Sequence, residues 1–283
     1  MILIKRVAAI HDISGVGKCS LTAAIPIISC AGVECNPIPT TVLSTHTGDI
    51  KGYTFTDLTD DIVPYCKHWN SLGIFPDTIY TGYLGSAKQV QIVIDSINLL
   101  KKESTKIIVD PAMADSGILY KGFDNDFPAK MSVLCKEADI IVPNITEACL
   151  MTGTKYETNY DSIYIENLLY KLSDFTKRFV ILTGVSFSKD KIGCSIFDKE
   201  NQDIKWLFSE KYDGTYYGTG DIFASVIAAG ITKGFDCNYS TEIALEFVRR
   251  AIKETFENKT DTRFGVAFEN HLPFLIKSFG GQI

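Results

Sequence analysis

Short apolar runs alternate with longer apolar segments of helical spacing along most of this chain, and no other feature limits its fold as strongly. The runs with the composition of buried strands lie at residues 7–10, 78–80, 106–110, 139–142 and 179–183. The first two lead into helix-like segments at 21–30 and 89–100. The alternation predicts an α/β fold with a mainly parallel central sheet and helices on both of its faces.

The size and composition of the chain are those of a globular protein with a substantial core. It has 283 residues, of which 46% are hydrophobic. We find no internal repeat, low-complexity tract or linker-like stretch, so we expect a single domain spanning residues 1–283. Residues 258–283 carry the weakest pattern. No apolar run approaches the roughly 20 residues of a membrane span, so we expect no membrane association.

Charge and cysteine usage narrow the class of partner. The formal net charge is -6 without any basic block, which argues against nucleic acid and favours a small ligand. The eight cysteines are scattered without a C-x-x-C pair, and most lie in apolar stretches. This usage indicates reduced thiols in a cytoplasmic protein rather than a disulfide framework or a zinc site.

Polar residues and glycines follow the predicted strands. They form the segments His11–Gly15, Thr81–Tyr83, Asp110–Pro111, Pro143–Glu147 and Thr183–Gly184. In parallel α/β sheets, ligands bind beyond the carboxyl ends of the strands. We therefore expect the functional site to be built from these segments.

A second candidate segment is Tyr217–Ala224, in which two glycines and an acid open an apolar stretch that runs to Gly234. Gly218 and Gly220 can adopt backbone angles closed to other residues, so we expect a loop that opens a helix with free amides. Such amides bind anions, phosphate above all. Because Asp221 would repel phosphate, we interpret it as a base that deprotonates a hydroxyl attacking the phosphorus atom. The alternative is that Asp221 only caps a buried helix.

Two nucleotide-binding motifs are excluded. The segment Ser14–Ser20 resembles a P-loop, but the pattern requires glycine where Asp12 stands and serine or threonine where Cys19 stands. The pairs Gly15-x-Gly17 and Gly218-x-Gly220 each lack the third glycine of the dinucleotide fingerprint. A nicotinamide enzyme is therefore disfavoured.

The Asn144-x-x-Glu147 motif follows the strand at 139–142 and starts an apolar segment. Taken alone, it is a capping box, in which Asn144 caps a helix and Glu147 completes the motif. A carboxylate at the end of a strand can also hold Mg²⁺ through water, and Asp110, at the end of another strand, could supply a second acid near the same phosphates.

The combination of Asn144-x-x-Glu147 with Gly218-Thr219-Gly220-Asp221 closely resembles the ribokinase-like superfamily. The resemblance covers nearly the whole chain and is strongest for its vitamin-kinase branch. The segments 44–48, 81–83 and 146–148 are similar to bacterial pyridoxal/pyridoxamine kinases, whereas His11-Asp12-x-Ser14-Gly15 is also similar to hydroxymethylpyrimidine kinases. Both groups phosphorylate a hydroxymethyl group on a nitrogen heteroaromatic ring.

The resemblance implies an ATP-dependent kinase of vitamin B6 salvage, with Asp221 as the base and the amides of Gly218, Thr219 and Gly220 as an anion hole. It places Ser14, Thr47 and Tyr83 at substrate positions, where Tyr83 offers an aromatic wall to a flat ring. His46 and Asp12 are weaker candidates for the same role. His46 could contact the substrate or only shape its loop, and Asp12 departs from the glutamine or serine of many pyridoxal kinases.

The resemblance also implies a site for Mg-ATP. The residues at the matching positions near the phosphates are Asp110, Asn144, Glu147, Thr183 and Gly184, of which Glu147 and Asp110 would serve the metal. The segment 208–217 would pass near the adenine, and Lys18 is expected to be a solvated surface charge. Many relatives hold a monovalent cation near the anion hole, which no residue here singles out. A homodimer is expected from the family.

Three alternatives remain at this point. The first is a hydroxymethylpyrimidine or hydroxymethylpyrimidine-phosphate kinase of thiamine synthesis. The second is a sugar kinase, which is disfavoured because sugar hydroxyls call for several carboxylates and amides. The third is a vitamin-binding relative without catalysis, against which the presence of both Asp221 and Glu147 argues.

Overall fold

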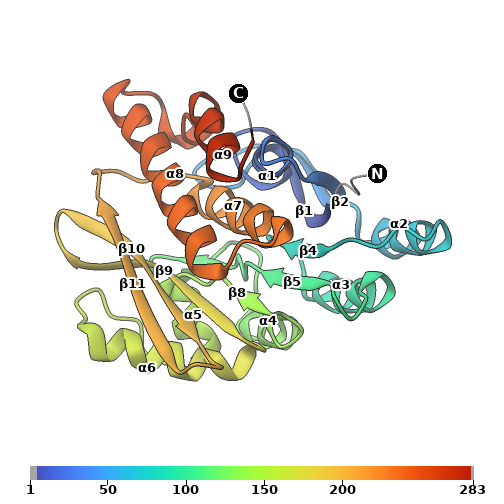
Figure 1. The fold of residues 1–283 in the computed structure, drawn as a ribbon, viewed down its shortest axis with the longest axis horizontal. Coiled ribbons are helices and arrows are strands. Elements are labelled where there is room, and N and C mark those ends of the chain that lie inside the picture. Colours follow the sequence, from blue (N-terminus) through green and yellow to red (C-terminus); the bar gives the residue numbers. More distant parts are fainter. Residues whose placement is uncertain (1–4, 282–283) are drawn as a thin grey trace.

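The computed structural model describes residues 5–281, and a nine-stranded sheet runs through them (Figure 1). Its strands are β1 (Arg6–Val16), β2 (Glu34–Thr45), β3 (Phe55–Asp57), β4 (Thr78–Thr81), β5 (Lys106–Val109), β8 (Ile140–Ile141), β9 (Phe179–Ser188), β10 (Lys191–Asp198) and β11 (Asp203–Glu210). The spatial order is β11-β10-β9-β8-β5-β4-β1-β2-β3. A small second sheet pairs β6 (Ala114–Asp115) with β7 (Ile118–Leu119).

The six strands from β2 to β9 in this order are parallel, as predicted, while β3, β10 and β11 are antiparallel to their neighbours. The parallel strands carry their carboxyl ends to one edge of the sheet. That edge therefore collects the polar segments that follow β4, β5 and β8.

Helices cover both faces of the sheet (Figure 1). One face carries α1 (Ser20–Cys30), α7 (Thr219–Lys233), α8 (Cys237–Glu257) and α9 (Leu272–Ser278). The other carries α2 (Thr59–Ser71), α3 (Ala87–Leu100), α4 (Phe127–Cys135), α5 (Ile145–Thr152) and α6 (Ser162–Leu172). Ile107 belongs to one core and its neighbour Ile108 to the other. Side chains of a strand alternate between faces, which is why the central strands are apolar at every position.

Two strands run further than the apolar pattern predicted. We expected β1 to end at Ile10, but it continues to Val16, with a register shift against β2 between His11 and Ile13. We expected β9 to end at Thr183, but it continues to Ser188. Polar segments that were expected to follow these strands therefore lie inside them, because a bulge allows pairing to continue while it redirects side chains.

Loops connect the elements, and the remaining elements in the described residues are short 3-10 helices. They are η1 (Ser173–Phe175), η2 (Thr262–Phe264) and η3 (Glu269–His271). The last two belong to the stretch 258–283, which carried the weakest pattern, and of that stretch residues 282–283 lie outside the described residues. No helix in the part of the chain that the structure describes is long and apolar enough to cross a membrane.

Candidate functional site

The glycine-rich turn before Asp221 opens α7, as predicted. Gly218 is the residue before the helix and has a left-handed φ of +76°. A Cβ atom there would lie 2.1 Å from the carbonyl oxygen of Lys18, so the turn packs directly on the loop before α1. Gly220 lies in the helix and has no left-handed φ, so only Gly218 uses the conformational freedom of glycine. The space beside it is open, since a Cβ atom would meet nothing within 4 Å.

Asp221 does not cap its own helix. Its Oδ1 accepts a hydrogen bond from the Nε2 atom of His11 at 3.0 Å, and its Oδ2 accepts one from the amide of Ser20 at 2.8 Å. Ser20 has a φ of +52°, an uncommon angle for a serine, and such strain is concentrated at functional sites. The carboxylate is therefore held by His11 of β1 and by Ser20, the first residue of α1, rather than by the amides of α7. This arrangement disfavours the capping alternative.

The His11 ring joins Asp221 to a second carboxylate. Its Nδ1 atom lies 2.9 Å from Oδ1 of Asp12, and the other oxygen of Asp12 accepts a hydrogen bond from Ser14 at 3.1 Å. His11, Asp12 and Ser14 all lie in β1 and are buried. Both oxygens of the predicted substrate residue Asp12 are thus engaged within the protein, and the hydroxyl of Ser14 is directed to Asp12.

Burial and charge shift the pKa values of this cluster in opposite directions. Burial alone would lower the pKa of His11, but the negative charges of Asp221 and Asp12 and the hydrogen bonds to them raise it to about 10. Burial alone would raise the pKa of Asp221, but the charge and hydrogen bond of His11 and the amide of Ser20 bring it below its ordinary value. The cluster favours an ionised Asp221 beside a protonated His11.

Asn144 and Glu147 form the predicted capping box at the start of α5. Oδ1 of Asn144 accepts from the amide of Glu147 at 2.9 Å, and Oε2 of Glu147 accepts from the amide of Asn144 at 2.8 Å. The other oxygen of Glu147 accepts from the amide of Met113 at 3.0 Å. The motif therefore ties α5 to the segment that follows β5, in addition to capping the helix.

Asp110 and Glu147 are buried acids that oppose each other's ionisation. Burial first, and then the charge of Asp221, raises the pKa of Asp110 to about 8. Burial and the charge of Asp110 raise the pKa of Glu147 well above its ordinary value, against the hydrogen bonds from backbone amides. A cation near both would relieve this repulsion. Within residues 5–281, no group of three or more His, Cys, Asp or Glu side chains is arranged to hold a metal ion.

The predicted substrate residues beyond β1 lie on loops. Tyr83 follows β4, packs its half-buried ring against Phe123 at 5.6 Å between ring centroids, and has a pKa raised to about 12, mainly by burial. Thr47 is exposed. His46 approaches the carbonyl oxygen of Arg263 and accepts from the amide of Gly48 at 3.1 Å. Both ring nitrogens of His46 are engaged in loop contacts, which favours the interpretation that it shapes the loop.

On the predicted nucleotide side, Thr183 lies in β9 and forms an isolated bridge with Asn144, which follows β8. Gly184 has a φ of +77° and stands at the register shift between β9 and β10, so it is the bulged residue. Lys18 lies at the surface, in line with the expectation of a solvated charge. Its Nζ atom forms an ion pair with Glu269 at 2.8 Å.

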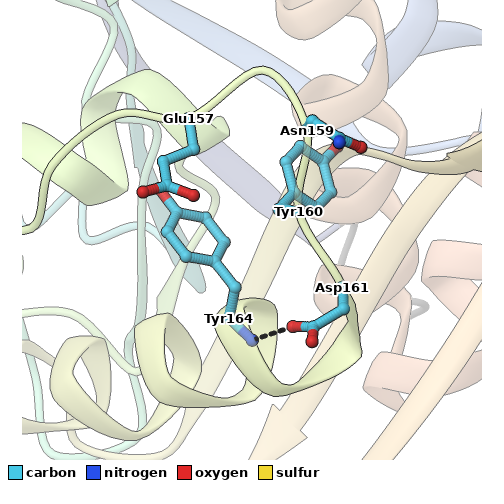
Figure 2. Close-up of a pocket in the computed structure, with 5 residues that line it drawn as sticks. All are labelled: Glu157, Asn159, Tyr160, Asp161 and Tyr164. Carbon is cyan, nitrogen blue, oxygen red and sulfur yellow. Dashed lines mark hydrogen bonds between the residues drawn. The ribbon is translucent and has the colours of Figure 1, made fainter.

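An open hollow of about 350 Å³ lies at the start of α6, lined by Glu157, Asn159, Tyr160, Asp161 and Tyr164 (Figure 2). It contains none of the predicted site residues. The hydroxyl of Tyr160 contacts β9 nearby, because it accepts a hydrogen bond from the amide of Ser186 at 3.1 Å. The hollow therefore borders the strand that carries Thr183 and Gly184 without including either.

No pattern in the sequence identified His11 as a site residue. His11 stands among the polar residues after a predicted strand, but nothing local pairs it with an acid 210 positions away. Gly82 leaves room for the His11 ring, because a Cβ atom there would lie 1.9 Å from Nε2 of His11. Only the fold brings that glycine and the histidine together.

Known proteins resemble this chain over most of its length. The family model described as phosphomethylpyrimidine kinase matches residues 21–264. A pyridoxal kinase of Dictyostelium discoideum is 27% identical over 243 residues, which cover 81% of this chain and 79% of the relative.

Two solved structures have the same fold. A putative phosphomethylpyrimidine kinase from Bacteroides thetaiotaomicron, crystallised with pyridoxal, is 35% identical with a TM-score of 0.91 and covers 96% of each chain. The pyridoxal kinase from Lactobacillus plantarum is 31% identical with a TM-score of 0.88, covering 99% of this chain and 100% of its own.

Proposed function

The chain belongs to the phosphomethylpyrimidine kinase family and is an ATP-dependent kinase, and we propose that its acceptor is the hydroxymethyl group of pyridoxal, pyridoxamine or pyridoxine. The relative with pyridoxal in its crystal, which shares 35% of its residues with this chain, supports this class of substrate. The observation that carries the chemistry is the carboxylate of Asp221 at the N-terminus of α7, which is hydrogen-bonded to His11 and to the amide of Ser20.

In this proposal, Asp221 accepts the proton of the substrate hydroxyl as its oxygen attacks the γ-phosphorus of ATP. The bond from that phosphorus to the bridging oxygen breaks, and ADP leaves. The amides of Gly218, Thr219 and Gly220 stabilise the charge on the transferring group, because they stand at the positive end of the helix dipole. The open space beside Gly220 leaves room for phosphoryl oxygens.

Asp110 and Glu147 would hold Mg²⁺, either directly or through water, and bring it to the phosphates of ATP. Their residue types fit a magnesium ion. Burial raises the pKa of both acids, the charge of Asp221 adds to this for Asp110 and the charge of Asp110 adds to it for Glu147, so a cation there would stabilise both charged forms. When bound, the ion neutralises charge on the phosphate oxygens. Thr183 and Gly184 border the same strand ends and are the proposed phosphate contacts beside Asn144.

Thr47 and Tyr83 are proposed to contact the vitamer ring, and so is Ser14, once its hydroxyl exchanges its hydrogen bond to Asp12 for one to the substrate. Tyr83 offers its half-buried ring as a wall, and Thr47 is exposed and free to donate a hydrogen bond. Asp12 and His46 are engaged within the protein and would support these contacts indirectly. A monovalent cation near the anion hole and a homodimeric assembly complete the proposal.

The test of the substrate is a panel of alcohols with Mg-ATP. We expect turnover of at least one B6 vitamer at a higher kcat/KM than hydroxymethylpyrimidine or ribose. The description of the matching family makes hydroxymethylpyrimidine the second candidate. Turnover of the pyrimidine alone would overturn the proposed acceptor and leave the kinase assignment intact.

The test of the base is Asp221→Asn. We expect kcat to fall by roughly 10²–10⁴-fold, because asparagine cannot accept the proton, while binding of ATP and the vitamer changes little. Calorimetry would measure binding, and a coupled ADP assay would measure turnover. Asp174→Asn, on the exposed η1, serves as the matched control. A variant at 221 with normal kcat would remove Asp221 from the mechanism, and a protein that binds the vitamer but has no activity before mutation would favour the non-catalytic alternative.

A further inference from the structure

The imidazole of His11 is fully buried between two carboxylates. Nε2 lies 3.0 Å from Oδ1 of Asp221, and Nδ1 lies 2.9 Å from Oδ1 of Asp12. The ring also fills the space left by Gly82, where a Cβ atom would lie 1.9 Å from Nε2. Its position is therefore set by packing as well as by hydrogen bonds.

The two acids determine which protons the ring carries. An ionised carboxylate only accepts hydrogen bonds, so both contacts are hydrogen bonds only if both ring nitrogens carry a proton. The amides of Asp12 and Tyr83 also approach Nδ1 and Nε2, at 2.9 and 3.4 Å, and would donate to a neutral ring. Against the effect of burial, the charges of Asp221 and Asp12 and the hydrogen bonds to them raise the pKa of His11 to about 10, which favours the cation over these contacts.

We propose that His11 is a positioning residue for phosphoryl transfer, which as an imidazolium orients the carboxylate of Asp221 and keeps it ionised in a buried site. This inference rests on the proposed role of Asp221 as the base. His11 itself neither gains nor loses a proton in the reaction.

The geometry leaves Asp221 able to act. A carboxylate has about four lone-pair positions, and His11 and Ser20 occupy one on each oxygen. The side chain of Asp221 is 16% exposed, whereas that of His11 is 1% exposed. A substrate hydroxyl can therefore reach the acid but not the histidine.

The titratable groups that surround Asp221 and His11 come from several elements. They are Asp12 of β1, Cys19 before α1, His46 after β2, Tyr80 of β4 and Asp110 after β5. The acids Asp12 and Asp110 oppose a charge on Asp221, and the attraction from His46 is weaker than that from His11. His11 is the cation in hydrogen-bond contact with the base.

The experiment is the pH profile of His11→Gln with Mg-ATP and the vitamer that the wild type turns over best. Glutamine keeps a hydrogen-bond donor but removes the charge. We expect kcat to fall by roughly 10–100-fold with smaller changes in KM, because the base is less often ionised and less well oriented. The acid limb of the kcat profile should move up by about 1–3 pH units. His68→Gln, at an exposed position of α2, is the matched control and should leave kcat and the acid limb of its pH profile unchanged.

A second measurement uses the unaltered protein and needs no stable variant. The chain has four histidines, so ¹⁵N spectra of histidine-labelled protein are simple to assign. We expect one ring to stay protonated on both nitrogens at pH 8, well above the ordinary histidine pKa of about 6.5. A neutral His11 at pH 8 would overturn the inference.

The two roles can fail separately. An active Asp221→Asn enzyme would overturn the proposed base. An inactive Asp221→Asn enzyme together with an unshifted acid limb in His11→Gln would overturn the role of His11 alone.

Discussion

At the scale of single residues, burial of the proposed magnesium ligand Asp110 makes the free energy of unfolding depend on pH. Its pKa of about 8 lies above the ordinary 3.8, so its contribution to stability is fully present below pH 3.8 and is lost as the pH rises through 8. We predict that Asp110→Asn raises the free energy of unfolding at pH 9, without Mg²⁺, by roughly 1–3 kcal/mol, since one pKa unit corresponds to about 1.4 kcal/mol. This increase in the free energy of unfolding should shrink steadily towards pH 4. The kinase activity of the variant should be lower than that of the wild type. Denaturant unfolding at several pH values measures this, with Asp174→Asn as the control. An equal effect at all pH values would contradict the prediction.

At the scale of elements, the turn into α7 contains two glycines that we expect to respond differently to substitution by alanine. Gly218→Ala would force a Cβ atom to within 2.1 Å of the Lys18 carbonyl oxygen at a φ of +76°, so we predict a loss of roughly 1–3 kcal/mol in stability. Gly220→Ala meets nothing within 4 Å and replaces a helical glycine, so stability should rise by up to about 1 kcal/mol. Its kcat should nevertheless fall, because the new methyl group enters the space proposed for phosphoryl oxygens. Thermal denaturation measures the change in stability, and kcat measures the effect on catalysis. A fully active Gly220→Ala enzyme would show that phosphoryl oxygens do not occupy the space beside Gly220.

At the scale of the whole molecule, the edge strand β3 leaves one side of the sheet open to pairing with a second chain. The three residues of β3 are exposed, with Phe55 48% exposed, and Val42 of β2, which pairs with Thr56, is also exposed. Unpaired edges with apolar side chains pair readily with another chain. We predict a homodimer with a mass near twice 31.3 kDa in light scattering, and a shift towards the monomer in Phe55→Lys. Ile163→Lys, on exposed α6, should leave the mass unchanged. A monomeric wild type would contradict the prediction.

That residues 1–283 form one domain stays a prediction.

Much of the fold was predictable because its signals are local. Continuous apolar runs identified the central strands, since strands covered on both faces have no polar side. The capping box of Asn144 and Glu147 and the start of α7 near Gly218 were readable for the same reason, because a cap or a left-handed turn depends on a few neighbouring residues. The family resemblance rests on these same short motifs.

The sequence alone therefore determined the α/β class, the parallel sheet and the identity of the acid at 221, all of which follow from short-range pattern. The tertiary structure decided what that acid contacts. The His11 ring, the amide of Ser20 and the space at Gly82 come from segments up to 210 positions apart, and no local pattern encodes their meeting. It also decided that β1 continues through a bulge, because strand length depends on a neighbour to pair with. Charge on a buried acid is a property of its surroundings, and those surroundings exist only once the chain has folded.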